Sequence, residues 1–264
     1  MSKQVSHREP STPTADDVMT PEWSARSYRT VPVVLGFAAG YVDGCTFVTL
    51  FGLFVAQVTG SFVIAGAILV VREYGALIKV LAIPVFLLGG AVATALVSVA
   101  RHAGWRASTL VLGLESLLLA GQLVTLLFVP SLNDPDQATA LAAGLFGLSA
   151  MGVQSAFVRL LMRGTPSTNV MTTNTTQVAI DATEILLARL WTSRSAGSPT
   201  RTDIGHARKR LAETVPIMLA FLGGTIAGAA AGQGVGVVCL VLPVAMLAGL
   251  TMLAPPPLRI ARHR

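Results

Sequence analysis

Asp43 is an acidic residue within an apolar run that begins near Val31. A carboxylate at membrane depth costs about 2.5 to 3.5 kcal/mol on insertion scales, so such a residue is by default a functional candidate. At about 1.5 Å per helical residue, Asp43 lies roughly 18 Å beyond Val31, near the middle of a spanning helix. Three roles are open: a proton or cation site, a hydrogen-bond partner for Gln154 or Gln122 on another helix, or a protonated structural residue.

Glu115 is a second acidic residue in an apolar stretch, and it follows Thr109 by six residues. It therefore lies roughly 9 Å from the start of that stretch, where water or a long basic side chain can reach it. It could pass protons toward Asp43, or it could pair with Arg101 or Arg106 at the membrane interface. The sequence leaves both roles open.

Two motifs of small polar residues, Thr59-Gly60-Ser61 and Thr172-Thr173-Asn174, each stand near the start of a short helix-like stretch. Their oxygen atoms can cap free backbone N–H groups, which is a purely structural role. A helix start that points into the protein would also offer N–H groups and a partial positive charge to an anionic ligand. The predicted substrate or proton pathway consists of Asp43, Glu115, Gln154, Gln57, Thr59, Gly60, Ser61, Thr172 and Asn174.

The composition indicates that a membrane surrounds these residues. Of 264 residues, 53% are hydrophobic and 12% are charged, and the mean hydropathy is +0.67; about a quarter of the residues in a soluble domain are charged. A spanning helix needs about 20 mostly apolar residues. Six stretches meet this requirement: 31–55, 80–100, 109–129, 138–160, 214–232 and 235–254. The sequence therefore predicts an all-α membrane protein with six transmembrane helices.

Two further stretches, 59–71 and 172–190, are too short or too polar for full spans. Charge supports leaving them out of the count. Of the 19 basic residues, all but Arg72 and Lys79 lie in four places. They precede the first span, follow the last span, lie between the second and third spans, or lie near or within the segment between the fourth and fifth spans. Because basic residues concentrate on cytoplasmic loops, six spans place both termini in the cytoplasm. The two short stretches are then re-entrant or interfacial half-helices.

The two halves of the chain resemble each other. Residues 35–43 align with 146–154, so that Asp43 corresponds to Gln154, and residues 58–61 then align with 171–174. Because each half has three spans, an odd number, the second copy crosses the membrane in the opposite orientation to the first. Many secondary transporters with broken helices have this arrangement. The glycines in this alignment could equally serve close helix packing in a protein that transports nothing.

These patterns divide the chain into three parts. Residues 1–29 contain three prolines among polar residues and are predicted to be a disordered cytoplasmic tail rather than a signal peptide. Residues 30–254 form the membrane domain, with repeat A at 31–129 and repeat B at 138–254. Residues 255–264 form a basic cytoplasmic tail.

The charged residues of the second half are interpreted as a surface. Gln177, Asp181 and Glu184 recur at helical spacing, which favours a solvated helix face. The basic residues at 201–210 are expected to form a cytoplasmic loop that contacts anionic lipid.

Several classes of function are not expected. Cys45 and Cys239 each lie in an apolar segment and are interpreted as small core residues rather than a disulfide. The four histidines are scattered, so we expect no metal, and we find no nucleotide or catalytic motif. We therefore expect no enzyme, no cofactor and no nucleic-acid partner. The expected partners are the lipid bilayer and a small solute, and a homo-oligomer is left open.

Several short motifs resemble a known family: Gly40-Tyr41-Val42-Asp43, 58–61, Glu115-Ser116-Leu117-Leu118, 151–154 and Met171-Thr172. Together they are similar to the YoaK-type membrane proteins, which are bacterial six-span proteins of unknown function. The resemblance covers about residues 30–254 and implies architecture rather than activity. The T-G-N motif of that family ends in Ser61 here, and its T-G-T motif reads Thr172-Thr173-Asn174.

The leading hypothesis is a secondary transporter or channel for a small, unidentified solute. Proton coupling would run through Asp43 with Glu115 as a relay. The alternative is a non-transporting scaffold or regulatory component of the membrane that acts through the basic cytoplasmic loop at 189–210.

Overall fold

The computed structural model describes residues 23–68, 70, 76–128, 137–190 and 201–254, and within these ranges it is entirely helical. Apolar residues dominate the sequence and internal hydrogen bonding makes helices the natural form in lipid. The elements in chain order are α1 (Ala25–Thr49), α2 (Val58–Ile68), α3 (Ala76–Ala103), α4 (Ala107–Leu127), α5 (Ala138–Leu161), α6 (Met171–Leu190), α7 (Arg201–Val235), the 3₁₀ helix η1 (Gly236–Leu240) and α8 (Val241–Leu253).

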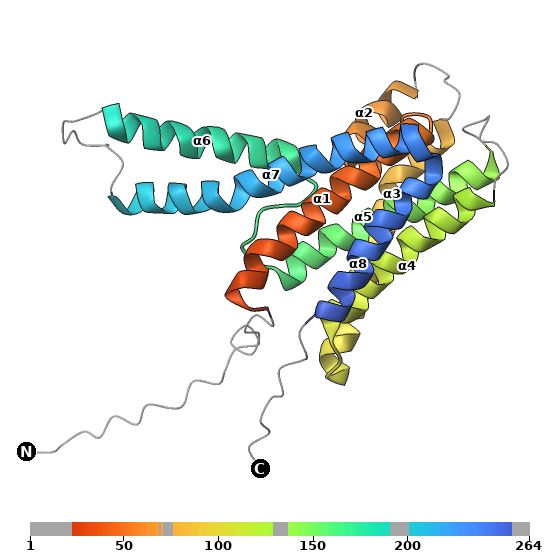
Figure 1. Ribbon diagram of the computed structural model, residues 1–264, viewed down its shortest axis with the longest axis horizontal. Coiled ribbons are helices and arrows are strands. Elements are labelled where there is room, and N and C mark those ends of the chain that lie inside the picture. The colour runs from red at the N-terminus through yellow and green to blue at the C-terminus, as the bar shows by residue number, and fades with distance from the viewer. Residues whose placement is uncertain (1–22, 69, 71–75, 129–136, 191–200, 255–264) are drawn as a thin grey trace, which may run out of the picture.

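Five of the described helical segments are long and apolar enough to cross a membrane: α1, α3, α4, α5 and the 52-residue stretch Thr202–Leu253. That last stretch contains nearly all of α7 together with η1 and α8, and Figure 1 shows α8 turning back beside the end of α7. Gly236, with φ of 64°, permits the turn, which lies close to the boundary between the predicted spans 214–232 and 235–254. The chain is therefore a multi-pass membrane protein.

One end of the bundle collects basic residues, and we call it the basic end. The Tyr28 hydroxyl near the start of α1 donates to the carbonyl of Leu161 at the end of α5 (3.5 Å). Arg106, just before α4, donates to the carbonyl of Ala254, just after α8. Arg101 in the last turn of α3 donates to a carbonyl in the last turn of α5. These bonds bring the start of α1 and α4 and the end of α3, α5 and α8 together.

The helices α1 and α7 make the most extensive contact in the bundle, and glycines allow it. A Cβ at Gly40 or Gly44 of α1 would overlap backbone of α7, and a Cβ at Gly224 or Gly228 of α7 would overlap backbone of α1. Gly152 does the same where α5 meets α3. Both helix pairs therefore pack backbone against backbone, as small residues permit in membranes.

Gly224→Ala is expected to lower stability by about 1 to 3 kcal/mol, because the new methyl group must push α1 and α7 apart. Its neighbour Gly223 has open space where a Cβ would stand. Gly223→Ala should therefore leave stability unchanged or raise it slightly, since alanine favours the helix. Thermal unfolding of both purified variants measures the difference. Equal melting temperatures would show that the contact between α1 and α7 is looser than described.

Two predicted boundaries of the first half are wrong. Residues 25–29 belong to α1 rather than to a disordered tail, while 1–22 lie outside the described residues. The predicted span 31–55 ends at Thr49, because the chain turns at Phe51 and Gly52, both with positive φ. Residues 50–57 instead form a linker that leads back to α2, at the position of the predicted half-helix 59–71.

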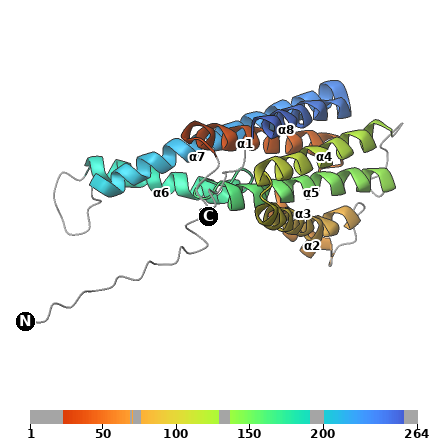
Figure 2. The ribbon, with the colours of Figure 1, turned by 90° about the horizontal axis from the view of Figure 1, so that it is seen from below.

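Two predictions for the second half are also corrected. Residues 201–210 begin the 35-residue helix α7 rather than forming a loop, because α6 packs beside this part of α7 and orders it. Figures 1 and 2 show α6 and the first part of α7 side by side, extending past the other helices. Residues 191–200, and the tail 255–264, lie outside the described ranges.

The two cysteines form a disulfide, so their interpretation as unpaired core residues is wrong. Cys45 of α1 and Cys239 of η1 are both buried, with Cα atoms 7.0 Å apart. They are 194 positions apart in the chain. Only the contact of α1 with η1 brings them together, and no local pattern indicates that contact.

Candidate functional site

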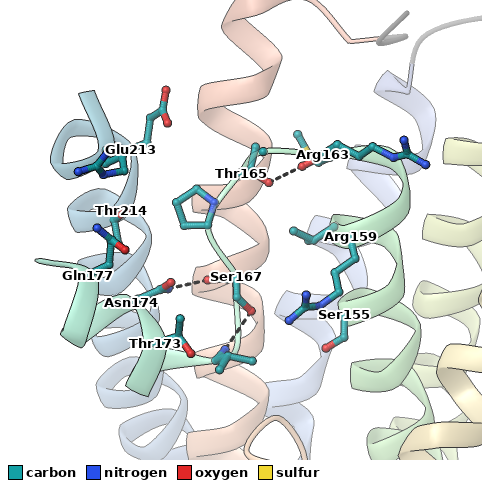
Figure 3. Close-up of a pocket in the computed structure, with 16 residues that line it drawn as sticks. Ser155, Arg159, Arg163, Thr165, Ser167, Thr173, Asn174, Gln177, Glu213 and Thr214 are labelled. Carbon is teal, nitrogen blue, oxygen red and sulfur yellow. Dashed lines mark hydrogen bonds between the residues drawn. The ribbon is translucent and has the colours of Figure 1, made fainter. Parts of the chain in front are cut away.

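A polar cavity of about 510 Å³ opens at the basic end between α5, α6 and α7. Its wall includes the last two turns of α5, part of the linker 162–170, the first turns of α6 and the middle of α7. Figure 3 shows these side chains arranged around the linker. The polar residues of its lining include Ser155, Arg159, Arg163, Thr173, Asn174 and Glu213.

Side-chain hydrogen bonds hold the linker in place. Asn174 of α6 donates through Nδ2 to the carbonyl of Ser167 (2.7 Å), and the Ser167 hydroxyl accepts the backbone N–H of Val170 (3.1 Å). Asn169 donates through Nδ2 to the Ser155 hydroxyl of α5 (2.6 Å). The linker is thus tied to α5 on one side and to α6 on the other, which fixes the wall of the cavity.

An ion pair joins α6 to α7 beside the cavity. Arg210 of α7 donates to Asp181 of α6 (Nη2 to Oδ1, 2.6 Å) and lies 3.6 Å from Glu184. Gln177 donates to the same Asp181 oxygen (3.0 Å). Asp181 is 1% exposed, so its assignment to a solvated face is wrong. The face that carries Gln177, Asp181 and Glu184 packs toward α7 instead, because α7 continues beyond the bundle as a helix.

Arg159 is the guanidinium group best placed to meet a ligand in the cavity. In Figure 3 it reaches from α5 toward the interior, whereas Arg163 extends away from the other labelled side chains. Within the described part of the chain, Arg159 forms no hydrogen bond or ion pair. It leaves one positive charge available inside a walled, polar space.

A strip of buried polar residues lies deeper in the bundle, where α4 contacts α5. Glu115 and Gln122 of α4 are both 0% exposed and stand seven residues, about two turns, apart on one face. Neither Glu115 oxygen, and neither polar atom of the Gln122 amide, has a hydrogen-bond partner among the described residues. Of the two roles that the sequence left open for Glu115, the pairing with Arg101 or Arg106 is therefore not formed.

Gln154 of α5 is the third member of this strip. Gln122 lies against Gly147, whose missing side chain makes room for the amide. The helices α4 and α5 run in opposite directions. Glu115 lies seven residues before Gln122 on α4, and Gln154 lies seven residues after Gly147 on α5, so Glu115 and Gln154 are at the same level of the bundle. Gln154 donates to the carbonyl of Leu35 (3.0 Å) and to the hydroxyl of Thr168 in the linker (2.9 Å), while its Oε1 has no partner in the part of the chain that the structure describes. The strip thus approaches the wall of the cavity.

Asp43 lies away from this strip and has a different set of partners. Its Oδ1 accepts the backbone N–H groups of Val55 (2.7 Å) and Ala56 (2.9 Å) in the linker between α1 and α2. The Gln57 side chain is a further hydrogen-bond partner. Asp43 therefore anchors a loop, and the partners considered from sequence, Gln154 and Gln122, are not the ones that the structure gives.

The other predicted site residues are dispersed. Thr59 at the start of α2 is exposed and Gly60 is half-buried, whereas Ser61 is buried. On α6, Thr172 is exposed and Asn174 lines the cavity. The nine predicted residues do not converge on one point, because Asp43 lies near the end of α1, while Gln154 lies near the end of the antiparallel helix α5.

The whole sequence was compared with protein families, curated proteins and solved structures. The family model described as "Protein of unknown function (DUF1275)" matches residues 31–253. The chain belongs to the DUF1275 family. This is the YoaK-type family that the motifs indicate. Neither a curated protein nor a solved structure matches the chain.

Sequence reasoning missed two functional candidates of this DUF1275 protein. Arg159 was grouped with the bases that set membrane orientation, and Gln122 was considered only as a partner of Asp43. An arginine four residues after Ser155, on the same helix face, was the available signal for the first. The spacing of seven between Glu115 and Gln122, in a stretch where Ser116 is the polar residue that separates them, was the signal for the second.

Proposed function

We propose that this DUF1275 protein is a secondary transporter for a small solute, with six spans and its basic end in the cytoplasm of a bacterial inner membrane. The observation that carries the proposal is the buried Glu115, whose two carboxyl oxygens lack partners within the described ranges. A negative charge there would need a proton or a cation to neutralise it. A group that takes up and releases such an ion can couple an ion gradient to solute movement.

The helix contacts support two inverted halves of three spans each. In that scheme α1 corresponds to α5, α2 to α6, α3 to α7, and α4 to α8. The contact of α1 with α7 then corresponds to that of α5 with α3, and the contact of α2 with α3 to that of α6 with α7. The contact of α4 with α5 corresponds to that of α8 with α1. The contact of α4 with α8 corresponds to itself, because the axis exchanges these two helices. These pairs are present, as a two-fold axis would require, whereas the contact of α3 with α4 is matched by a contact of α7 with η1 rather than with α8.

The linker anchors support the same scheme. Asp43 holds Val55 in the first half, and Gln154 holds Thr168 in the second. Asp43 aligns with Gln154, and continuing the alignment of 58–61 with 171–174 backward matches Val55 with Thr168. In each half, a polar residue near the end of the first helix therefore binds the same position of the following linker. The two bonds differ in kind, since Asp43 accepts a backbone N–H and Gln154 donates to a hydroxyl, but they join corresponding positions of the two halves.

The polar strip and the cavity together suggest a route. The cavity opens at the basic end, and Gln154 connects the strip to the linker that walls it. A solute that enters the cavity would move toward Glu115 along the contact of α4 with α5. This route replaces Asp43 with Glu115 as the proposed ion-coupling group.

The test is proton flux in proteoliposomes that contain the purified protein and a pH-sensitive dye, with a panel of small anions and neutral solutes. Glu115→Gln should lower solute-dependent proton flux at least about tenfold, equivalent to about 1.4 kcal/mol of barrier. Glu115→Asp should retain part of the flux. Asp203→Asn, which changes an exposed carboxylate in the first turn of α7 outside the cavity lining, is the matched control. Equal fluxes for wild type and Glu115→Gln with every solute would contradict the proposal.

The projecting pair of α6 and α7 favours one second candidate, a non-transporting scaffold or regulatory component. Ile180, Leu186 and Leu190 of α6 are exposed apolar residues on this projection. A protein partner that is lost with Ile180→Ser and Leu186→Ser, in cells where Glu115→Gln has no effect, would favour scaffolding over transport.

A further inference from the structure

We propose that the cavity between α5, α6 and α7 is a binding site for a phosphate group, with Arg159 as its principal contact. The inference goes beyond transport, because such a site binds its ligand whether or not the ligand crosses the membrane. It also concerns residues outside the set predicted from the sequence, apart from Asn174.

The charges around the cavity leave Arg159 uncompensated. Three guanidinium groups and one carboxylate, Glu213, line the space. Asp181 and Glu184 compensate Arg210. Glu213 pairs with Lys209 (4.0 Å) rather than with Arg159. An anion that enters the cavity therefore meets the available guanidinium group of Arg159. The carboxylates near the cavity already pair with other basic residues.

The neutral groups on the wall are suited to phosphate oxygens. The Ser155 hydroxyl accepts from Asn169, which leaves its own proton to donate into the cavity. Thr173 and Asn174 bring the first turn of α6 to the wall, and the N–H groups of a helix start add a partial positive charge. A guanidinium group offers two parallel N–H donors to one phosphate, a geometry that a lysine lacks.

The volume indicates a ligand larger than inorganic phosphate. A cavity of about 510 Å³ lies within the usual range for organic small-molecule sites, which is about 300 to 1,000 Å³. A phosphate ester fits this description, and it could come from a lipid headgroup or from a free metabolite. The two sources share the same contact with Arg159, so the experiment separates them.

The experiment uses the full-length protein in nanodiscs of phosphatidylcholine at constant ionic strength. In one arm, glycerol 3-phosphate is titrated and the melting temperature is recorded, with chloride as the reference anion. In the other arm, phosphatidylglycerol replaces a fifth of the lipid. We expect wild type to be stabilised in at least one arm, and Arg159→Gln to weaken the apparent affinity at least about tenfold. Arg208→Gln removes an exposed arginine of α7 outside the cavity and should change nothing.

Each outcome decides the proposal. Stabilisation by glycerol 3-phosphate that needs Arg159 assigns the site to a free phosphate ester, and stabilisation only by phosphatidylglycerol that needs Arg159 assigns it to a headgroup. No stabilisation in either arm, or equal stabilisation of wild type and Arg159→Gln, overturns the proposal. Should Arg159→Gln fail to fold, Ser155→Ala tests the same wall, with an expected loss of affinity of several-fold.

Discussion

Asp43→Ala is expected to destabilise the protein by about 2 to 5 kcal/mol. The substitution removes the only oxygen that accepts the N–H groups of both Val55 and Ala56, and each buried donor left unpaired costs about 1 to 3 kcal/mol. Val55 and Ala56 are themselves buried, so their N–H groups depend on an acceptor within the protein. Thermal unfolding in detergent and the monodisperse yield from size-exclusion chromatography measure the effect.

The control for this prediction is Asp43→Asn. Its amide oxygen can still accept both N–H groups, so the variant should fold and should keep most of its stability and flux. A proton or cation site at Asp43 predicts the opposite pattern, in which Asp43→Asn folds but is inactive. Wild-type stability of Asp43→Ala would show that the linker does not depend on this anchor.

Glu115→Leu is expected to raise stability by about 1 to 3 kcal/mol while abolishing coupled flux. A buried polar group without partners costs roughly this amount, and an apolar side chain of similar size removes the cost. Proteins commonly keep such a costly group where function needs it. Unfolding measurements and proton flux on the same preparation test both halves of the prediction.

Gln122→Leu is the companion variant, since Gln122 is equally buried and also unpartnered. It should likewise raise stability, although its effect on flux depends on whether the solute passes it. A lower melting temperature for Glu115→Leu would mean that the carboxyl group forms a stabilising interaction in the folded protein. The proposed role of Glu115 as an ion-coupling group would then lose its support.

The helices were largely predictable from sequence, because a bilayer imposes one requirement on every span. An apolar run of about 20 residues must be helical, so α3, α4 and α5 lie where composition puts them. Residues 59–68 and 172–190 of the weaker stretches are also helical, in α2 and α6. The end of α1 was predicted too late because residues 50–55 are mostly apolar, and apolar composition does not distinguish a buried loop from a helix. Composition alone does not register the turn at Phe51 and Gly52.

The candidate site was less predictable, because it depends on contacts between distant segments. Asp43 stood out in the sequence as an acidic residue in an apolar run, but its partners are backbone groups of a linker, which carry no sequence signal. Asp181 was placed in solvent because its partner Arg210 is 29 residues away. Ser155 one helical turn earlier was the sequence signal for Arg159, and only the packing of α6 and α7 shows that this helix face lines a cavity.

The glycine contacts have a mechanical consequence for any movement of the bundle. Because α1 touches α7 backbone to backbone, and α3 touches α5 in the same way, neither pair can separate without losing its closest packing. Each pair unites one helix from the first half of the chain with one from the second. The rigid units of a working cycle would then be these mixed pairs rather than the two sequence halves, and displacement would be concentrated at α4 and α8, which lie outside both.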